Sequence, residues 1–194
     1  EQTSSRETGV AAWATIGRMR LAAGEVNAAL EAARRAQAID PEAEGVAQLA
    51  LMLMNPRQPQ AEAMVRRYLD GSKALPEIRQ EYARALMGAQ RFAEATAQLQ
   101  TLTRTAPQET QAWLMLGTLE LQDRQYDAAE KSLRRYVDLA APQRTNAPRA
   151  EAAQGLAQAY LALAQIAELI SLYDRNDGGA VQLQHSLTAV DERI

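Results

Sequence analysis

TQAWLMLGTLELQDRQYDAAEKSLRRYVDLAAP, the sequence from Thr110 to Pro142, contains two amphipathic segments separated by a polar break. In each segment the apolar residues recur at three- and four-residue intervals, which is the spacing of a helix that buries one face. The break is Gln122-Asp123-Arg124, and Pro142 stands where a helix cannot continue. The stretch therefore predicts two short helices joined by a tight turn. Their apolar residues are Trp113, Leu116, Leu119 and Leu121 in the first helix, and Tyr126, Ala129, Leu133, Tyr136 and Val137 in the second.

The order of large and small residues in this stretch resembles the tetratricopeptide repeat, a helix-turn-helix unit of about 34 residues. The resemblance implies an all-α fold, in which such units stack into a right-handed α-α superhelix, or solenoid. The Ala-, Arg- and Gln-rich composition is similar to that of bacterial, and specifically proteobacterial, members of the family. The residues that carry the resemblance are Trp113, Leu116, Gly117, Ala129, Leu133 and Pro142.

Two earlier stretches repeat this signature. The first contains Trp13-x-x-Ile16-Gly17 and closes at Pro41. In the second, Arg79 occupies the place of the tryptophan, but the later residues keep the spacing. Three residues of that stretch lie 34 positions before their counterparts: Phe92 before Tyr126, Ala95 before Ala129, and Leu99 before Leu133.

These matches divide the chain into a flexible tail over residues 1–9 and about five units. The expected units are 10–43, 44–75, 76–109, 110–143 and an irregular fifth unit over 144–194. Unit 44–75 is short, and its turn contains two prolines, Pro56 and Pro59. In the fifth unit the repeat register is ambiguous. We expect a polar insertion, one long helix from Arg149 to about Tyr173, a break at 174–179, and a last amphipathic helix with Leu183, Leu187, Val190 and Ile194.

Small residues at the signature positions should let helices approach closely, whereas both tryptophans should belong to the core. A pair of arginines recurs near the end of the second helix in three units. These pairs could form a solvated face whose positive charge interacts favourably with the helix C-terminus, or they could bind an acidic partner. The small residues are Gly17, Ala29, Ala83, Ala95, Gly117 and Ala129, and the pairs are Arg34-Arg35, Arg66-Arg67 and Arg134-Arg135.

Composition and charge exclude several classes of partner. The 194 residues are 47% hydrophobic and 23% charged, with a net charge of −3, so no concentrated positive charge favours nucleic acid or an anionic membrane surface. The longest apolar run, residues 47–54, is too short for a membrane span. Cysteine is absent, which removes disulfides, thiolate catalysis and cysteine-based metal sites.

The inventory of catalytic and metal-binding residues is also poor. His185 is the single histidine, so neither a zinc site nor a Ser-His-Asp set can be assembled convincingly. The sequence Asp174-Arg175-Asn176-Asp177-Gly178-Gly179 superficially resembles a calcium loop, but it has glycine at the fifth position and His185 at the twelfth. We therefore predict a protein that is not an enzyme and that uses no metal and no cofactor.

The family resemblance places binding residues in the concave groove, which the first helix of each unit lines. Flexible methionines and leucines beside amides suit an extended or helical peptide. Several of these residues could instead pack between units, Met52 and Leu114 in particular. The Lys and Asn clamp that one branch of the family uses to hold a terminal carboxylate is missing. The expected groove residues are Arg18, Leu21, Gln48, Met52, Gln80, Arg84, Met87, Leu114, Thr118, Leu121 and Gln122.

Two functions fit these observations. The first is a non-enzymatic scaffold that binds a peptide or protein segment, such as an assembly factor of a bacterial envelope or secretion complex. The second is a helical accessory or regulatory domain of a larger enzyme. The chain begins at Glu1 without a methionine and ends on the apolar Ile194, from which we expect a piece of a longer protein. The compartment is either the cytoplasm or the periplasm and envelope, with the periplasm slightly favoured.

Overall fold

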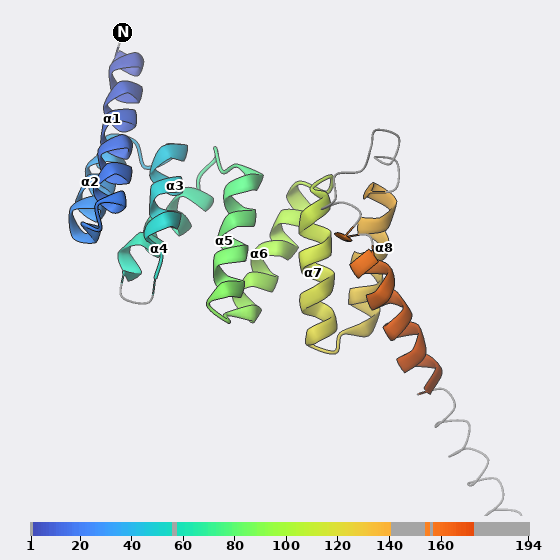
Figure 1. The fold of residues 1–194 in the computed structure, drawn as a ribbon. Helices are drawn as coiled ribbons and strands as arrows, with labels where there is room; N and C mark the ends of the chain where they lie inside the picture. Colours follow the sequence, from blue (N-terminus) through green and yellow to red (C-terminus); the bar gives the residue numbers. More distant parts are fainter. Residues whose placement is uncertain (1, 56–57, 141–153, 156, 173–194) are drawn as a thin grey trace, which may run out of the picture. The chain divides into compact units, whose positions relative to one another are not determined.

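The computed structural model describes residues 2–55, 58–140, 154–155 and 157–172, and the regular structure of these residues is entirely α-helical (Figure 1). The chain divides into two compact units, residues 1–109 and 110–194. The predicted all-α fold class is thus confirmed. We describe each unit separately. The insertion after Pro142, the break at 174–179, His185 and the last predicted helix lie outside the described residues.

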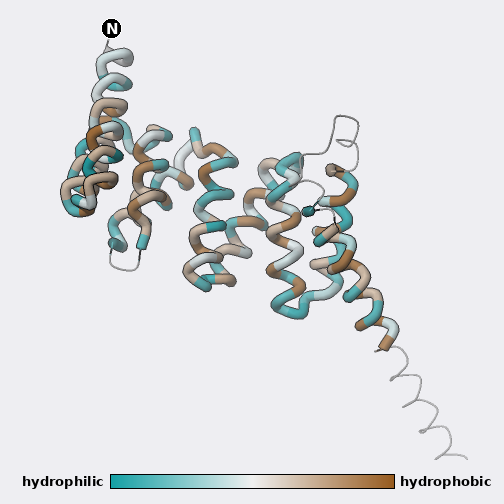
Figure 2. Tube along the Cα trace, in the orientation of Figure 1, coloured by the Kyte–Doolittle hydropathy of each residue, from teal (hydrophilic) through white to brown (hydrophobic). Residues whose placement is uncertain are grey.

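The first unit consists of three helical hairpins. They are α1 (Gln2–Ala22) with α2 (Val26–Ile39), α3 (Glu44–Leu53) with α4 (Pro59–Leu69), and α5 (Pro76–Gly88) with α6 (Phe92–Thr105). The first helix of one hairpin packs on the first helix of the next, since α3 contacts both α1 and α5. Helix α3 is apolar along almost its whole length (Figure 2), which allows it to bury several faces at once. The second hairpin is the short one, as the sequence predicted.

The start of the first helix differs from the expectation. Helix α1 begins at Gln2, whereas the sequence predicted a flexible tail over residues 1–9. The side chains of residues 4–8 are exposed, and the Thr8 hydroxyl donates to the Ser4 carbonyl at 2.8 Å within the helix. A helix that projects into solvent needs no apolar face, so periodicity gives no signal for it. The structure corrects the expected boundary for this physical reason.

The second unit contains α7 (Thr110–Gln122), α8 (Tyr126–Ala140) and further helix over residues 154–155 and 157–172. Helices α7 and α8 form the hairpin that the opening stretch of sequence predicted. One buried apolar cluster joins this hairpin to the later helix, which agrees with the predicted long fifth-unit helix over its described part. The cluster consists of Leu114, Ala129, Leu133, Tyr136, Ala140, Ala159 and Ile166.

Small residues allow close packing at the expected positions. Ala29, Ala95 and Ala129 are fully buried in the second helices of their hairpins. A Cβ atom added at Gly117 would lie 2.7 Å from Cγ of Leu133, and one added at Gly17 would overlap the Leu49 side chain. Both approaches require the absence of a side chain, because real Cβ contacts are longer. The assigned register of small and large residues therefore agrees with the packing.

Three of the hairpins make the same left-handed turn. Gly24, Gln90 and Arg124 each have a φ of about 60–80°, and each follows the last turn of a first helix. The next residue donates its N–H to the carbonyl five positions earlier, as in Arg91 to Leu86 at 2.9 Å. This bond satisfies a carbonyl at the helix end. The short second hairpin instead starts α4 at Pro59, whose fixed φ suits the first helical position.

The tryptophan position of the signature is only partly buried. Trp13 packs against a small cluster that includes Val10 and Val46, and the Arg35 guanidinium lies 4.7 Å from its ring centroid. Trp113 packs against the cluster of the second unit. Arg79 replaces the tryptophan in the third hairpin, where it donates to the Leu69 carbonyl at 2.8 Å and so caps the C-terminus of α4.

Candidate interaction groove

A groove lies between α3 and α5, the first helices of two successive hairpins in the first unit. Its volume is about 600 Å³, which falls within the range typical of ligand sites. Residues spaced three and four apart on each helix line it, so one face of each helix contributes. The lining residues are Glu44, Gln48, Leu51 and Met52 from α3, and Glu77, Ile78, Glu81, Arg84 and Ala85 from α5.

The floor of the groove is apolar and incompletely covered. Ile78 is buried, Leu51 is partly buried, and Met52 has 57% of its surface exposed. An exposed methionine offers flexible apolar surface that a ligand can cover, which is a common property of surfaces that bind varied peptides. Met52 therefore marks the part of the groove where burial by a partner would yield the most free energy.

The polar rim is dominated by carboxylates. Arg84 donates to Glu81 at 2.6 Å, so the one guanidinium of the lining already has an anionic partner on its own helix. Gln48 donates to Glu44 at 2.6 Å. Among the described residues, neither Glu44 nor Glu77 has a cationic partner within ion-pair distance. The free charge of the groove is consequently negative.

Glu44 and Glu77 lie at the same end of the groove, because both belong to the first turns of their helices. Both charges act on the hydroxyl of Tyr68, whose pKa is raised chiefly by burial and further by these two carboxylates. The Tyr68 hydroxyl donates to the Lys73 carbonyl at 3.1 Å and accepts from the Leu75 amide at 3.4 Å. Tyr68 thus fixes the loop that leads into α5 directly beneath the acidic end.

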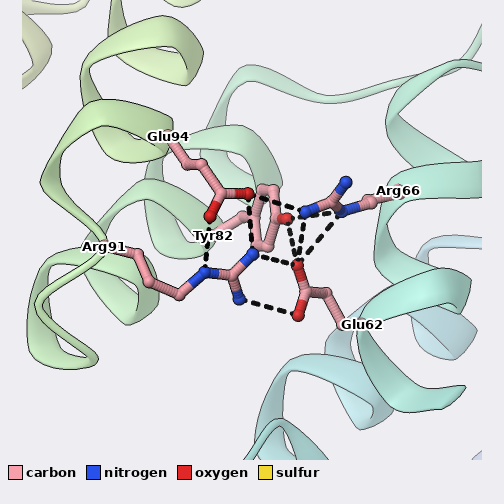
Figure 3. Close-up of polar contacts among 5 residues, drawn as sticks. All are labelled: Glu62, Arg66, Tyr82, Arg91 and Glu94. Atoms are coloured by element: carbon pink, nitrogen blue, oxygen red, sulfur yellow. Dashed lines mark hydrogen bonds and ion pairs between the residues drawn. The ribbon is translucent and has the colours of Figure 1, made fainter. Parts of the chain in front are cut away.

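An ionic cluster holds the second hairpin against the third (Figure 3). Arg91 donates from Nη1 and Nη2 to Glu62 at 2.8 Å, and from Nε and the same Nη2 to Glu94 at 2.7 Å. Arg66 bridges the same two carboxylates at 2.7 and 2.8 Å. The Tyr82 hydroxyl donates to Glu62 at 2.9 Å and accepts from Arg66 at 3.0 Å.

The cluster shifts the titration of its members. The pKa of Glu62 is lowered to about 2, mainly by the hydrogen bonds from Arg91 and against the opposing effect of burial. The pKa of Glu94 is also lowered, first of all by Arg91. Two arginines and two glutamates balance each other in charge, so the cluster stabilises the junction of α4, α5 and α6 at neutral pH. Because α4 pairs with α3, the junction also fixes the spacing of the groove helices.

Comparison with known proteins agrees with this architecture. Residues 82–144 match the family model of the tetratricopeptide repeat. These residues of the chain therefore contain tetratricopeptide repeats. Proteins with such repeats are generally non-catalytic scaffolds for protein–protein interaction, which is the class of function that this match indicates.

Solved structures of other repeat proteins resemble the chain in fold. PilF of Pseudomonas aeruginosa has 19% identity and a TM-score of 0.56, over 87% of this chain and 78% of PilF. MamA of Desulfovibrio magneticus RS-1 has 16% identity and a TM-score of 0.56, over 88% of this chain and 96% of MamA. YrrB, described as a repeat protein with an unusual peptide-binding site, has 14% identity and a TM-score of 0.51, over 91% of this chain and 98% of YrrB. A bacterial origin is consistent with these neighbours, and no curated protein matches the sequence.

The structure brings three of the expected groove residues together: Gln48, Met52 and Arg84. Arg18 is exposed on α1, where it donates to Thr15 at 3.1 Å. The remaining expected residues of the first unit are half-buried and do not line this groove: Leu21, Gln80 and Met87.

The expected groove residues of the second unit have different surroundings. Leu114 is only 6% exposed and belongs to the apolar cluster, and Leu121 packs against that cluster. Thr118 donates to the Leu114 carbonyl at 2.8 Å, whereas Gln122 is exposed. The structure therefore assigns packing roles to Leu114 and Leu121, which corrects their expected exposure in a groove.

Sequence reasoning missed the acidic rim. Glu44, Glu77 and Glu81 line the groove, but they are not among the groove positions that the family resemblance implies. The spacing of Glu77, Glu81 and Arg84 along one face of a predicted helix was the available signal. What the sequence could not show is that α3 brings Glu44 next to this face.

The described residues contain no group of three or more histidine, cysteine, aspartate and glutamate side chains that could hold a metal ion. In the same part of the chain, no helix combines the length and the apolar character needed to cross a bilayer.

Proposed function

We propose that the groove between α3 and α5 binds a peptide segment of a partner protein. The main support for this proposal is the exposed Met52 in the lining of a concave, partly apolar groove of about 600 Å³. A ligand that covers this surface gains roughly 25 cal/mol for each Å² of apolar area removed from water. The rim supplies carboxylates and an amide, which can orient a peptide by hydrogen bonds.

The rigidity of the junction supports the same proposal. The cluster of Glu62, Arg66, Tyr82, Arg91 and Glu94 joins α4 to α5 and to the start of α6 by contacts of 2.8–3.0 Å. A groove held in one geometry avoids part of the ordering cost of binding. Binding at a preformed groove therefore requires little rearrangement of the hairpins.

The test first selects a linear peptide that binds the whole protein from a random display library. The peptide is then labelled, and fluorescence anisotropy gives its affinity for the protein. Met52→Asp introduces a charge into the apolar floor, so we expect affinity to fall at least about ten-fold, the equivalent of about 1.4 kcal/mol. Met19→Asp is the matched control, because Met19 is 68% exposed on α1 and does not line the groove. Equal affinity for wild type and Met52→Asp, or an equal loss in both variants, would contradict the proposal.

A wider role remains a prediction. An assembly role in a bacterial envelope or secretion complex, and the alternative of an accessory domain of a larger enzyme, both rest on sequence features alone. The complete open reading frame distinguishes them: a catalytic domain beside these repeats favours the accessory domain, whereas a signal leader with further repeats favours the scaffold. Fractionation of the native host then tests the compartment.

A further inference from the structure

We propose that the segment bound in this groove is basic and amphipathic, with an apolar side chain against Met52 and a lysine or arginine at Glu44 and Glu77. This inference rests on the proposed function, because it names the chemistry of the ligand for the same groove.

The charge of the lining carries the first step. Three carboxylates and one guanidinium line the groove, and Arg84 is already paired with Glu81 at 2.6 Å. Glu44 and Glu77 are exposed, and within the described residues neither has a cationic partner. A positively charged ligand group would meet two acceptors there, whereas an acidic peptide or a terminal carboxylate would meet like charge.

Second, both carboxylates remain accessible to a ligand although they lie at helix N-termini. As first-turn residues, Glu44 and Glu77 also interact favourably with the N-termini of α3 and α5. That local role uses the helix dipole, but it leaves their oxygens open to solvent and to a ligand. Both line the same groove, so one ligand that occupies it can contact both carboxylates.

The third step is the separation between the charged and apolar parts. Met52 follows Glu44 by eight positions on α3, which corresponds to about 12 Å along a helix. An extended peptide rises about 3.3 Å for each residue. The ligand should therefore place its basic residue about four positions from its apolar anchor when it binds in an extended conformation.

The experiment compares two labelled peptides that are acetylated at the N-terminus and amidated at the C-terminus. Both peptides consist of alanine and serine around a single leucine anchor. Four positions from the leucine, the first peptide has a pair of lysines and the second has a pair of glutamates. Fluorescence anisotropy at low ionic strength should show at least about ten-fold tighter binding of the lysine peptide. Added salt should weaken its binding, because the rim is exposed.

Three variants of the whole protein sharpen the test. Glu44→Gln with Glu77→Gln should abolish most of the preference for the lysine peptide, and Glu44→Lys with Glu77→Lys should reverse it. The control is Glu7→Gln with Glu31→Gln, which changes the net charge equally at exposed residues outside the groove. Circular dichroism verifies that every variant keeps its helicity.

The outcomes separate this inference from the proposed function. If the glutamate peptide binds as well as the lysine peptide, or if the control pair weakens binding as much as the groove pair, the inference is overturned. If library peptides bind in a Met52-dependent way but lack basic residues, the inference alone fails. If no peptide of either charge depends on Met52, the groove has no such function and both proposals fail.

Discussion

Each of the two units contains a glutamate at a helix interface, and the two side chains have opposite environments. In the first unit, Glu62 accepts from two arginines and a tyrosine, and its pKa falls to about 2. In the second unit, Glu120 is 6% exposed, accepts from Ser132 at 2.7 Å, and has a raised pKa because burial outweighs that bond. The same helical-hairpin architecture therefore joins helices by ionic contacts in the first unit and by apolar packing in the second.

The difference follows from which residues occupy the interface. The junction of α4, α5 and α6 contains four charged side chains that are partly open to solvent. The cluster that joins α7, α8 and the helix over 157–172 is apolar and buried. An apolar cluster responds weakly to salt and pH, whereas an ionic junction depends on both.

Truncation of the apolar cluster should have the largest effect. Leu133 is fully buried against Gly117 and Tyr136, so Leu133→Ala leaves a cavity and should cost about 2–5 kcal/mol. Urea unfolding followed by circular dichroism gives the change in the free energy of unfolding. Leu161→Ala is the matched control in the same unit, because Leu161 is 63% exposed. Similar losses in the two variants, or a strong salt dependence of the Leu133→Ala effect, would contradict an apolar junction.

Removal of the central arginine should have a smaller but salt-dependent effect. Arg91→Met keeps an apolar side chain and leaves Glu62 and Glu94 with only Arg66. We expect the free energy of unfolding to fall by about 1–3 kcal/mol. The loss is smaller than for a fully buried ion pair because the cluster is partly exposed. Arg67→Met, at an exposed arginine of α4, is the control. The measurement is urea unfolding at low and high salt. If salt leaves the difference between Arg91→Met and wild type unchanged, the junction does not depend on charge.

The two glutamates should respond to acid in opposite directions. The pKa of Glu62 is lowered in the folded state, so its contribution is present above pH 4.5 and is lost as the pH falls toward 2. After allowance for solvent screening this contribution is about 1–2 kcal/mol. The pKa of Glu120 is raised, so its contribution is complete below the ordinary pKa and is lost as the pH rises through the folded value.

Glu62→Gln and Glu120→Gln test this prediction in urea unfolding over a range of pH. Glu62→Gln should be less stable than wild type at neutral pH, and the difference should shrink in acid. Glu120→Gln removes a charge that is buried at neutral pH, so it should be relatively most stable there. If both variants show the same dependence on pH, the two environments are not opposite.

The sequence predicted much of the fold because the repeat leaves a strong pattern of small and large residues. Ala95 and Ala129 are fully buried at positions deduced from a 34-residue interval, and the turn after Gln122 lies where the polar break placed it. The start of α1 was missed because residues 4–8 are exposed on a projecting helix. Periodicity detects burial, so it cannot detect a helix that buries nothing.

The site was less predictable, because it depends on contacts between hairpins. Met52 could be placed in a groove by family position, but the partner of Arg84 depends on the rotamer that brings Glu81 to 2.6 Å. Leu114 also occupies a groove position of the family, the counterpart of Gln80, but it is buried because a later helix of the second unit packs against it. The ionic cluster could not be predicted from the sequence either. Arg66 was identified only as part of a basic pair, because its partners lie on three different helices, α4, α5 and α6.

The smallest predicted effect concerns a feature that both units share, the left-handed turn. Gln90 in the first unit and Arg124 in the second hold φ near 60°, which is unfavourable for a residue with a Cβ atom, whereas Gly24 holds φ 78° without that cost. Gln90→Gly and Arg124→Gly should each stabilise the protein by about 0.5–1 kcal/mol, and Gly24→Ala should destabilise it by a similar amount. No other atom lies within 4 Å of a Cβ added at Gly24, so its effect should be purely conformational. Thermal melts of Gln90→Gly beside Gln90→Ala separate the backbone from the lost side chain. If the alanine variant gains as much stability as the glycine variant, the turn is not strained, and the two units share only its geometry.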